Sequence, residues 1–366
     1  MKVLFNSYNT ALHGGPATHL RFLEAELSKS LQLVRYQYER KSDTETAADK
    51  VLGRSADLLR LHRLIRAERP DLIHHNSSLD LRALLRDVPL ARLARFHKIP
   101  IFMKFHGTSR FVLSSTNPFV ASLRNSLFRN VDCIGVLSEV EKDELGRACP
   151  PVADRVAVVK NILAEEFGNV ERCEAPAPTV LFISRFIREK GMFDLLRAVP
   201  EVLKKCPDVH FTFVGSGSDE GAFEQEVRRL HLNGAVERVP HVSNLETLTF
   251  YSSAWMFVFP TTFPEGMPMV VAQAMAAGVP IITTPTRFSR SYMREGDHCL
   301  YIGYNDPDSI AKQICLLVRD KNLRERMSVN NRGLTGLFSA QQVAGEFVRL
   351  YERMLKRGWN AEGAAS

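Results

Sequence analysis

The sequence has no long apolar run, few cysteines and no dinucleotide-binding glycine fingerprint. No stretch approaches the roughly eighteen apolar residues that a membrane-spanning helix requires, and the apolar run at the N-terminus has no small-residue cleavage site behind it. The six cysteines form no CxxC pair and no metal-like spacing. We therefore expect a cytoplasmic protein with reduced, buried cysteines and no bound metal. The missing GxGxxG argues against a dinucleotide-dependent dehydrogenase.

The composition is that of a globular protein. With 366 residues, of which 45% are hydrophobic and 24% charged, the chain is long enough for two domains, each with its own core. The net charge of +7 comes from residues 1–162, which hold 25 Lys and Arg against 17 Asp and Glu, while the remainder holds 23 against 24. This asymmetry fits a phosphate-bearing acceptor or an anionic membrane surface, and it fits equally a solvated basic face.

Short apolar runs alternate with longer amphipathic segments, the pattern of βαβ units that build a parallel sheet covered on both faces. In the first half we expect strands at residues 2–6, 31–37, 71–75, 100–105, 132–136 and 156–160. Residues 164–178 are charged, then rich in Ala and Pro, and lack an apolar stripe. This composition predicts an interdomain linker.

After residue 178 the alternation restarts and predicts a second Rossmann-like domain. We expect strands at 179–184, 209–214, 235–239, 255–259 and 279–284, and helices at 191–204, 220–231, 245–252 and 267–277. A last helix, at about 339–357, carries an apolar face at helical spacing and should bury it: Val343, Phe347, Leu350, Tyr351 and Met354.

Two cations follow the first strand of the second domain. Arg185 comes directly after this strand, and Lys190 lies at the opening of the next helix. The carboxyl edge of a parallel sheet is where ligands bind in open α/β folds, so these cations are well placed to hold a diphosphate. Fixed cations would also stabilise the charge that develops on a departing nucleoside diphosphate. From spacing alone, it is equally possible that Arg185 and Lys190 are two solvated surface charges.

The segment 259–284 carries an acid and a helix start between two strands. Glu265 can accept hydrogen bonds from sugar hydroxyls, and the backbone N–H groups of Met269 and Val270 can meet a phosphate. Gln273 lies two helical turns beyond Glu265, where its amide could reach a ribose hydroxyl. The alternative interpretation of this segment is an ordinary βαβ crossover with an acid near a helix start.

In the first half, Gly14 and Gly15 precede a helix, which is a weak signal for phosphate binding.

Taken together, these phrases resemble glycosyltransferase family 4, retaining enzymes with the GT-B fold. EGMPMVVAQAMAAGVPII resembles the signature in which seven residues separate two glutamates. The other matching phrases follow in the order and spacing of the family: HGGPATHL, PDLIHHN, KFHG, CIGVLSE, VVKN, SRFIREKG and VGSGSDE. The resemblance implies two Rossmann-like domains with parallel sheets facing across a cleft and a C-terminal helix that crosses back. The acceptor-binding domain would be 1–163 with the helix at about 340–358, and the donor-binding domain 175–339.

The resemblance also implies roles for individual residues. Arg185 and Lys190 would grip the donor diphosphate, Glu265 would bind sugar hydroxyls, and His106 would lie near the sugar and acceptor. His19, His74 and His75 are weaker candidates. The remaining donor-binding positions are Gly14, Gly15, Gly215, Gly266, Met267, Met269, Val270 and Gln273, with His241 and Val242 contacting the base through backbone atoms.

Two departures from the family pattern bear on the donor. Gln273 replaces the second glutamate, so a charge-assisted ribose contact would become neutral and weaker. The Gly-Gly and Pro-Glu phrase that usually follows VPIITT is missing, and residues 284–298 around Arg287 differ. These departures leave the identity of the transferred sugar open.

The expected function is transfer of a sugar from a UDP- or GDP-sugar to a saccharide or lipid-linked saccharide in polysaccharide or cell-envelope synthesis. No metal, other cofactor or nucleic-acid partner is expected. The basic stretches at 82–98 and 117–130 suggest peripheral contact with an anionic membrane, or helices that simply cover the sheet. Two alternatives are a nucleotide-sugar 2-epimerase, which needs no acceptor, and a donor-binding partner subunit that has lost turnover.

Overall fold

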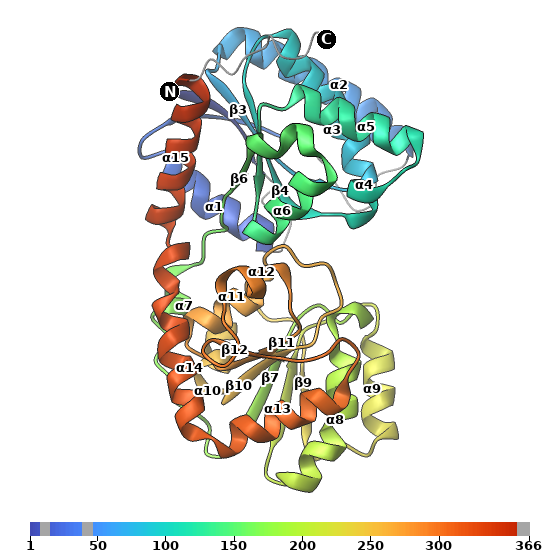
Figure 1. The fold of residues 1–366 in the computed structure, drawn as a ribbon, viewed down its shortest axis with the longest axis vertical. Helices are drawn as coiled ribbons and strands as arrows, with labels where there is room; N and C mark the ends of the chain where they lie inside the picture. Colours follow the sequence, from blue (N-terminus) through green and yellow to red (C-terminus); the bar gives the residue numbers. More distant parts are fainter. Residues whose placement is uncertain (8–14, 39–46, 357–366) are drawn as a thin grey trace. The chain divides into compact units, whose positions relative to one another are not determined.

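The computed structural model describes residues 1–7, 15–38 and 47–356, and it divides into two compact units. Unit 1 comprises Met1–Ile162 together with the C-terminal segment from Ala340, and unit 2 comprises Leu163–Ser339. Each unit has its own six-stranded parallel sheet with helices packed against it (Figure 1). The predicted fold class, two Rossmann-like domains with a C-terminal helix returning to the first, is confirmed.

The sheet of unit 1 has the order β2-β1-β3-β4-β5-β6. Its strands are β1 (Lys2–Asn6), β2 (Gln32–Tyr36), β3 (Leu72–Leu79), β4 (Ile101–Thr108), β5 (Cys133–Val136) and β6 (Val156–Val158). The helices are α1 (Gly15–Leu27), α2 (Ala47–Glu68), α3 (Leu81–Phe96), α4 (Arg110–Ser114), α5 (Pro118–Asn130), α6 (Glu139–Ala148) and the 3-10 turn η1 (Pro150–Arg155). Strand order reverses between β1 and β3, so the crevice at their carboxyl ends is where this topology binds ligands.

Side chains alternate along each strand of unit 1, so successive residues face two different apolar layers. Leu4 of β1 faces the layer that contains α2, α3 and α5, whereas Val3 and Phe5 face the layer that contains α1. The second layer also includes α15 (Ala340–Lys356), whose five predicted apolar residues are all buried there. The C-terminal helix therefore completes the core of unit 1, which Figure 1 shows as the red helix beside α1.

The sheet of unit 2 has the order β12-β11-β10-β7-β8-β9. Its strands are β7 (Thr179–Ile183), β8 (His210–Val214), β9 (Val236–Val239), β10 (Met256–Phe259), β11 (Ile281–Thr283) and β12 (Cys299–Tyr301). Its helices are α7 (Glu165–Gly168), α8 (Met192–Lys205), α9 (Glu220–Arg229), α10 (Thr247–Ser253), α11 (Met269–Ala276), α12 (Arg287–Tyr292), α13 (Pro307–Arg319) and α14 (Lys321–Gly333), with 3-10 turns η2 (Arg188–Lys190) and η3 (Thr335–Phe338). Here the strand order reverses between β7 and β10.

The segment expected as a linker is packed on unit 2. Phe167 is 1% exposed, the Arg172 guanidinium donates to the Tyr251 carbonyl at 2.7 Å, and the Trp255 indole donates to the Ala175 carbonyl at 2.8 Å. The linker prediction was wrong because these anchors are single side chains and backbone groups. They leave no apolar stripe that composition could reveal.

Candidate functional site

Glycines allow the loops that follow β7, β8 and β10 to approach one another closely at the carboxyl edge of the sheet of unit 2. Gly191, at φ 85°, has Pro260 so near that an added Cβ would lie 2.0 Å from its carbonyl oxygen. A Cβ added to Gly215, which has φ 146°, would likewise lie 1.9 Å from the Ser184 carbonyl oxygen. Only glycine fits these two places, and the loops after β7, β8 and β10 are thereby brought together at the switch point.

The turn between β7 and α8 anchors the loop after β10. The Glu189 carbonyl accepts hydrogen bonds from the backbone N–H groups of Thr262 at 2.8 Å and Phe263 at 3.1 Å. The Thr261 hydroxyl donates to the same carbonyl at 3.1 Å. One peptide group therefore fixes the register of two loops that lie about seventy residues apart in sequence.

Lys190 and Glu265, both candidate residues, form an ion pair across these two loops. The Lys190 ammonium donates to the Glu265 carboxylate, and the two side chains are 8% and 13% exposed. The same ammonium lies 4.4 Å from the centroid of the Phe263 ring. The structure thus brings together the cation expected to hold a diphosphate and the acid expected to bind a sugar.

Arg185 stands on the same edge but is solvent-exposed. No ion pair of its guanidinium occurs within the described part of unit 2. A guanidinium offers five donors in a planar fork, so Arg185 retains its capacity for bidentate phosphate binding.

The loops after β8 and β9 are joined through Ser216. Its hydroxyl accepts the backbone N–H of His241 at 3.2 Å, and its carbonyl accepts that of Phe186 at 3.0 Å. The side chain of His241 is exposed, and Val242 is partly exposed. These two predicted base-binding positions therefore lie on a loop that is tied to the loop bearing Arg185.

The α11 segment carries the remaining donor-binding candidates. Gly266 and Met267 are buried in the loop before the helix, and Met269 and Val270 form its first turn. Gln273 is 5% exposed, and its side-chain oxygen accepts a hydrogen bond from the Tyr251 hydroxyl at 3.3 Å. The sequence did not reveal this internal partner, because Tyr251 lies on α10, 22 residues earlier.

The altered segment after β11 is attached to the same edge. The Thr284 hydroxyl donates to the Thr261 carbonyl at 2.7 Å, and Thr286 caps α12 by accepting the backbone N–H of Ser289 at 3.1 Å. Arg287 is 5% exposed at the start of α12. The departure from the family phrase therefore builds a short capped helix at this place.

In unit 1, His106 belongs to a hydrogen-bonded chain at the carboxyl end of the sheet. Its Nε2 lies 3.2 Å from the Asn76 side-chain oxygen, which also lies 3.2 Å from Nε2 of His74. His74 Nδ1 in turn lies 2.5 Å from the Tyr351 hydroxyl of α15. Burial lowers the pKa of His106 and His74 well below the ordinary value, so both rings are neutral. Asn76, which the sequence analysis did not single out, fixes the His106 ring.

His75, the other weak candidate on β3, points into the opposite layer. Its Nδ1 lies 2.9 Å from the Tyr36 hydroxyl, and its Nε2 lies 3.2 Å from the Asp87 carboxylate. Burial opposes ionisation of Asp87, yet Arg86 and His75 outweigh it and lower the Asp87 pKa to about 2. His75 and Asp87 are both fully buried, so this dyad has a structural role.

Gly14 lies outside the described residues, and Gly15 begins α1. His19, on the same helix, is fully buried with its ring 5.8 Å from that of His106.

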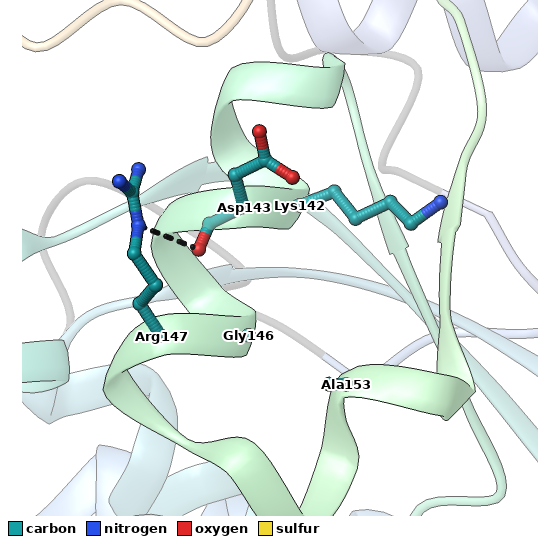
Figure 2. A pocket seen from close by; sticks show the side chains of 5 residues that line it. All are labelled: Lys142, Asp143, Gly146, Arg147 and Ala153. Atoms are coloured by element: carbon teal, nitrogen blue, oxygen red, sulfur yellow. Dashed lines mark hydrogen bonds between the residues drawn. The ribbon is translucent and has the colours of Figure 1, made fainter.

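Unit 1 has a pocket of about 370 Å³, and Figure 2 shows the residues that line it. It is lined by α6 and η1 through Lys142, Asp143, Gly146, Arg147 and Ala153. Arg147 points its guanidinium to the Asp143 carbonyl at 3.2 Å. None of the candidate residues lines this pocket.

Within the residues that the structure describes, no three His, Cys, Asp or Glu side chains gather as a metal site would require. The sequence has one Asp-x-Asp triplet, at 306–308, and its first carboxylate caps α13 by accepting the Ser309 N–H at 3.0 Å. No described helix combines the length and apolar character needed to cross a bilayer.

Comparison with known families identifies the class of enzyme that has this fold. Residues 165–334 match the family described as glycosyl transferases group 1, and residues 30–161 match the glycosyl transferase 4-like domain. The chain is therefore a glycosyltransferase with the GT-B fold, in which unit 2 is the group 1 domain and unit 1 the 4-like domain.

Individual relatives are similar over different shares of the chain. The lipopolysaccharide core biosynthesis glycosyltransferase LpsE of Rhizobium meliloti is 23% identical over 75% of this chain and 82% of its own length. Spore coat protein SA of Bacillus subtilis is 30% identical, but the match spans only 48% of each protein. Among solved structures, Anabaena HepE in complex with UDP-glucose superposes with a TM-score of 0.73 at 15% identity, covering 96% of this chain and all of the other.

Proposed function

We propose that this enzyme is a retaining glycosyltransferase of family 4 that transfers a hexose from a UDP- or GDP-sugar to a saccharide or lipid-linked saccharide. The observation that carries the proposal is the Lys190–Glu265 pair, with Arg185 on the same edge, at the switch point of unit 2. The complex of HepE with UDP-glucose supports a nucleotide-sugar donor. Relatives such as LpsE support a role in cell-envelope glycan synthesis.

Arg185 and Lys190 would neutralise the donor diphosphate without a metal, and Glu265 would accept hydrogen bonds from the sugar hydroxyls. The two cations stabilise the negative charge that grows on the departing nucleoside diphosphate, so they lower the barrier to bond cleavage. In front-face displacement, the leaving phosphate takes the proton of the attacking hydroxyl. No enzymic nucleophile is then needed, and the anomeric configuration is retained.

His106 would hold the acceptor side of the reaction as a neutral hydrogen-bonding group. Its Nε2 is engaged by Asn76, so the ring orientation is fixed before substrate arrives. A neutral ring suits a residue that positions an acceptor hydroxyl, because it adds no further positive charge that would hold the phosphate after reaction.

Peripheral membrane contact through α4 and α5 would explain the basic excess of unit 1. Phe111 and Phe119 are 61% and 59% exposed, and Arg124 and Arg129 lie on the same α5 helix. Aromatic side chains beside cations favour an anionic lipid interface. Co-sedimentation with anionic liposomes at low salt tests this contact. Binding should weaken in Phe111→Ser/Phe119→Ser and with added salt, and its complete absence at low salt excludes the contact.

Activity is tested with a panel of UDP- and GDP-sugars and saccharide or lipid-linked saccharide acceptors, with release of the nucleoside diphosphate as the first readout. The product's anomeric coupling constant in an NMR spectrum shows whether configuration is retained. A donor that is epimerised in the absence of any acceptor would instead establish the epimerase. Tight nucleotide binding without transfer to any member of a cell-derived acceptor pool would establish the partner subunit.

A further inference from the structure

Lys104 is the largest charged side chain to be fully buried in the described part of the protein. It lies on β4, two residues before His106, with no exposed surface. No carboxylate in the described residues forms an ion pair with it. The Glu346 carboxylate of α15 is paired instead with the neighbouring Lys160 ammonium, at 2.5 Å. A buried, unpaired ammonium is strongly disfavoured, so the protonation state of Lys104 must be read from its hydrogen bonds.

Two of the three contacts of the Lys104 nitrogen are with oxygens. Nζ lies 2.9 Å from the side-chain oxygen of Asn161 and 3.2 Å from the carbonyl oxygen of Lys160. Both oxygens are acceptors, so they take two N–H groups of Lys104. These contacts are satisfied equally by a neutral amine with two hydrogens and by an ammonium with three.

The third contact, with His19, distinguishes the two forms. The His19 Nδ1 accepts the backbone N–H of Ile162 at 2.7 Å, and a peptide N–H can only donate. A neutral imidazole with an unprotonated Nδ1 carries its hydrogen on Nε2. This Nε2 lies 2.7 Å from Lys104 Nζ. A donor therefore points at Lys104, which must offer a lone pair, and an ammonium has none.

The groups around this pair leave no other source of charge compensation. His106 on β4 and His74 on β3 are neutral rings, and the Phe347 ring of α15 has its centroid 5.2 Å from Nζ. Lys160 and Asn161 contribute neutral oxygens through the contacts already described. Burial acts in the same direction, because it lowers the pKa of both Lys104 and His19 well below their ordinary values.

We propose that Lys104 is a neutral amine in the folded enzyme and that, in this form, it is a positioning residue for the His106 side of the active site. It joins β4, the helix α1 through His19, and residues 160 and 161 by three hydrogen bonds in which every donor meets an acceptor. Because the His19 ring lies 5.8 Å from that of His106, these hydrogen bonds fix the position of a side chain beside His106. The functional importance of this hydrogen-bonded group rests on the proposed role of His106. The neutral state of Lys104 does not depend on that role.

The neutral state is tested directly on the native protein labelled with 15N at the lysine side chains. One Nζ resonance should have the chemical shift of an amine at pH 7, and it should be absent from the spectrum of Lys104→Met. If every Nζ resonance of the wild-type protein has the ammonium shift, the proposal is overturned. The wild-type spectrum decides this even where the variant fails to fold, and it is independent of transfer activity.

A second readout is the pH dependence of stability. An unfolded lysine titrates near ~10.4, so below that pH the unfolded chain binds one proton more than the folded chain, and folding strengthens as pH rises. The ratio of hydrogen-exchange protection on β4 between wild type and Lys104→Met should therefore rise about tenfold per pH unit from roughly pH 7 to 9. A ratio that stays constant over this range means that Lys104 is charged.

The positioning role is tested separately, by comparing the transfer activity of Lys104→Met and Lys104→Arg at pH 7. Methionine keeps a neutral side chain of similar length, whereas arginine remains charged. We expect kcat to fall further in Lys104→Arg than in Lys104→Met, with the KM for the donor little changed in both. An arginine variant as active as wild type would refute the positioning role.

Discussion

The Lys190 ammonium donates to the Glu265 carboxylate although the two residues are 75 positions apart in the chain. Their pairing places the ends of β7 and β10 in one site, at the point where strand order reverses in unit 2. Both partners are nearly buried, so each depends on the other for its charged state to be tolerated. A diphosphate that binds Lys190 therefore lies next to a carboxylate able to accept sugar hydroxyls.

Arg185→Ala should lower kcat about a hundredfold or more, because it removes a cation that stabilises the leaving group. Since Arg185 is exposed, the variant should keep its melting temperature. The matched control is Lys204→Ala, which removes another exposed cation of unit 2, at the last turn of α8 and so at the opposite edge of the sheet. Steady-state kinetics and thermal unfolding decide the matter. Near-normal turnover in Arg185→Ala would refute its role.

Lys190→Met and Glu265→Gln should separate stability from catalysis. Each single change leaves a nearly buried charge without its partner and should destabilise unit 2 by about 3 kcal/mol. The double variant removes both charges and should regain most of that stability while transfer stays abolished. Urea unfolding with a unit 2 probe and donor turnover are the two measurements. A double variant that transfers sugar would show that neither residue serves the reaction.

His106→Gln should reduce kcat about a hundredfold while donor affinity changes less than about twofold. Because the folded-state pKa of His106 lies well below the ordinary value, the ring stays neutral as pH falls through 6.5, and no inflection near 6.5 should arise from it in kcat/KM. His97→Gln, on the far end of α3, is the control. Wild-type transfer by His106→Gln would remove this residue from the mechanism.

The Asp87 cluster should make unit 1 sensitive to acid. The folded-state pKa of Asp87 is about 2, below that of an unfolded aspartate. Its stabilisation is therefore complete above roughly pH 4 and is lost as pH falls towards about 2. Hydrogen exchange on β3 peptides should show a steeper loss of protection in wild type than in Asp87→Asn. Parallel curves for the two proteins would contradict this assignment.

Gln273→Glu tests whether the departure from the family signature weakens donor binding. The new carboxylate can still accept the Tyr251 hydroxyl, but position 273 is only 5% exposed, so we expect the fold to be retained with a lower melting temperature. If the residue reaches the ribose, a charge-assisted bond should tighten nucleotide binding up to about tenfold. Calorimetric titration of wild type and variant with UDP and GDP measures this. Unchanged affinity for both would mean that position 273 serves only Tyr251.

Strand alternation predicted most of the fold because its signal is local. The β1 strand was predicted with its observed limits, and five of the six buried residues of α15 were predicted. No strand or helix was predicted between residue 284 and the last helix, so β12 and α12 to α14 were not anticipated.

The candidate site was predicted less completely, because hydrogen-bond partners depend on the fold. The phrases around Lys190 and Glu265 marked the two residues, but only the register of β7 against β10 shows that they meet. Asn76 and Lys104 lie in quoted phrases and gave no signal of their own. Their importance comes from partners such as His106 for Asn76 and Asn161 for Lys104, to which no short-range pattern connects them. The roles of the candidate residues stay predictions.

The structure of the enzyme crystallised with UDP, and separately with GDP, tests the central claim most directly. We predict that one of these nucleotides binds at the carboxyl ends of β7 and β10, with its phosphates in hydrogen-bond contact with Arg185 and Lys190. A nucleotide bound elsewhere on the protein, or bound there while both side chains point to solvent, would contradict the account.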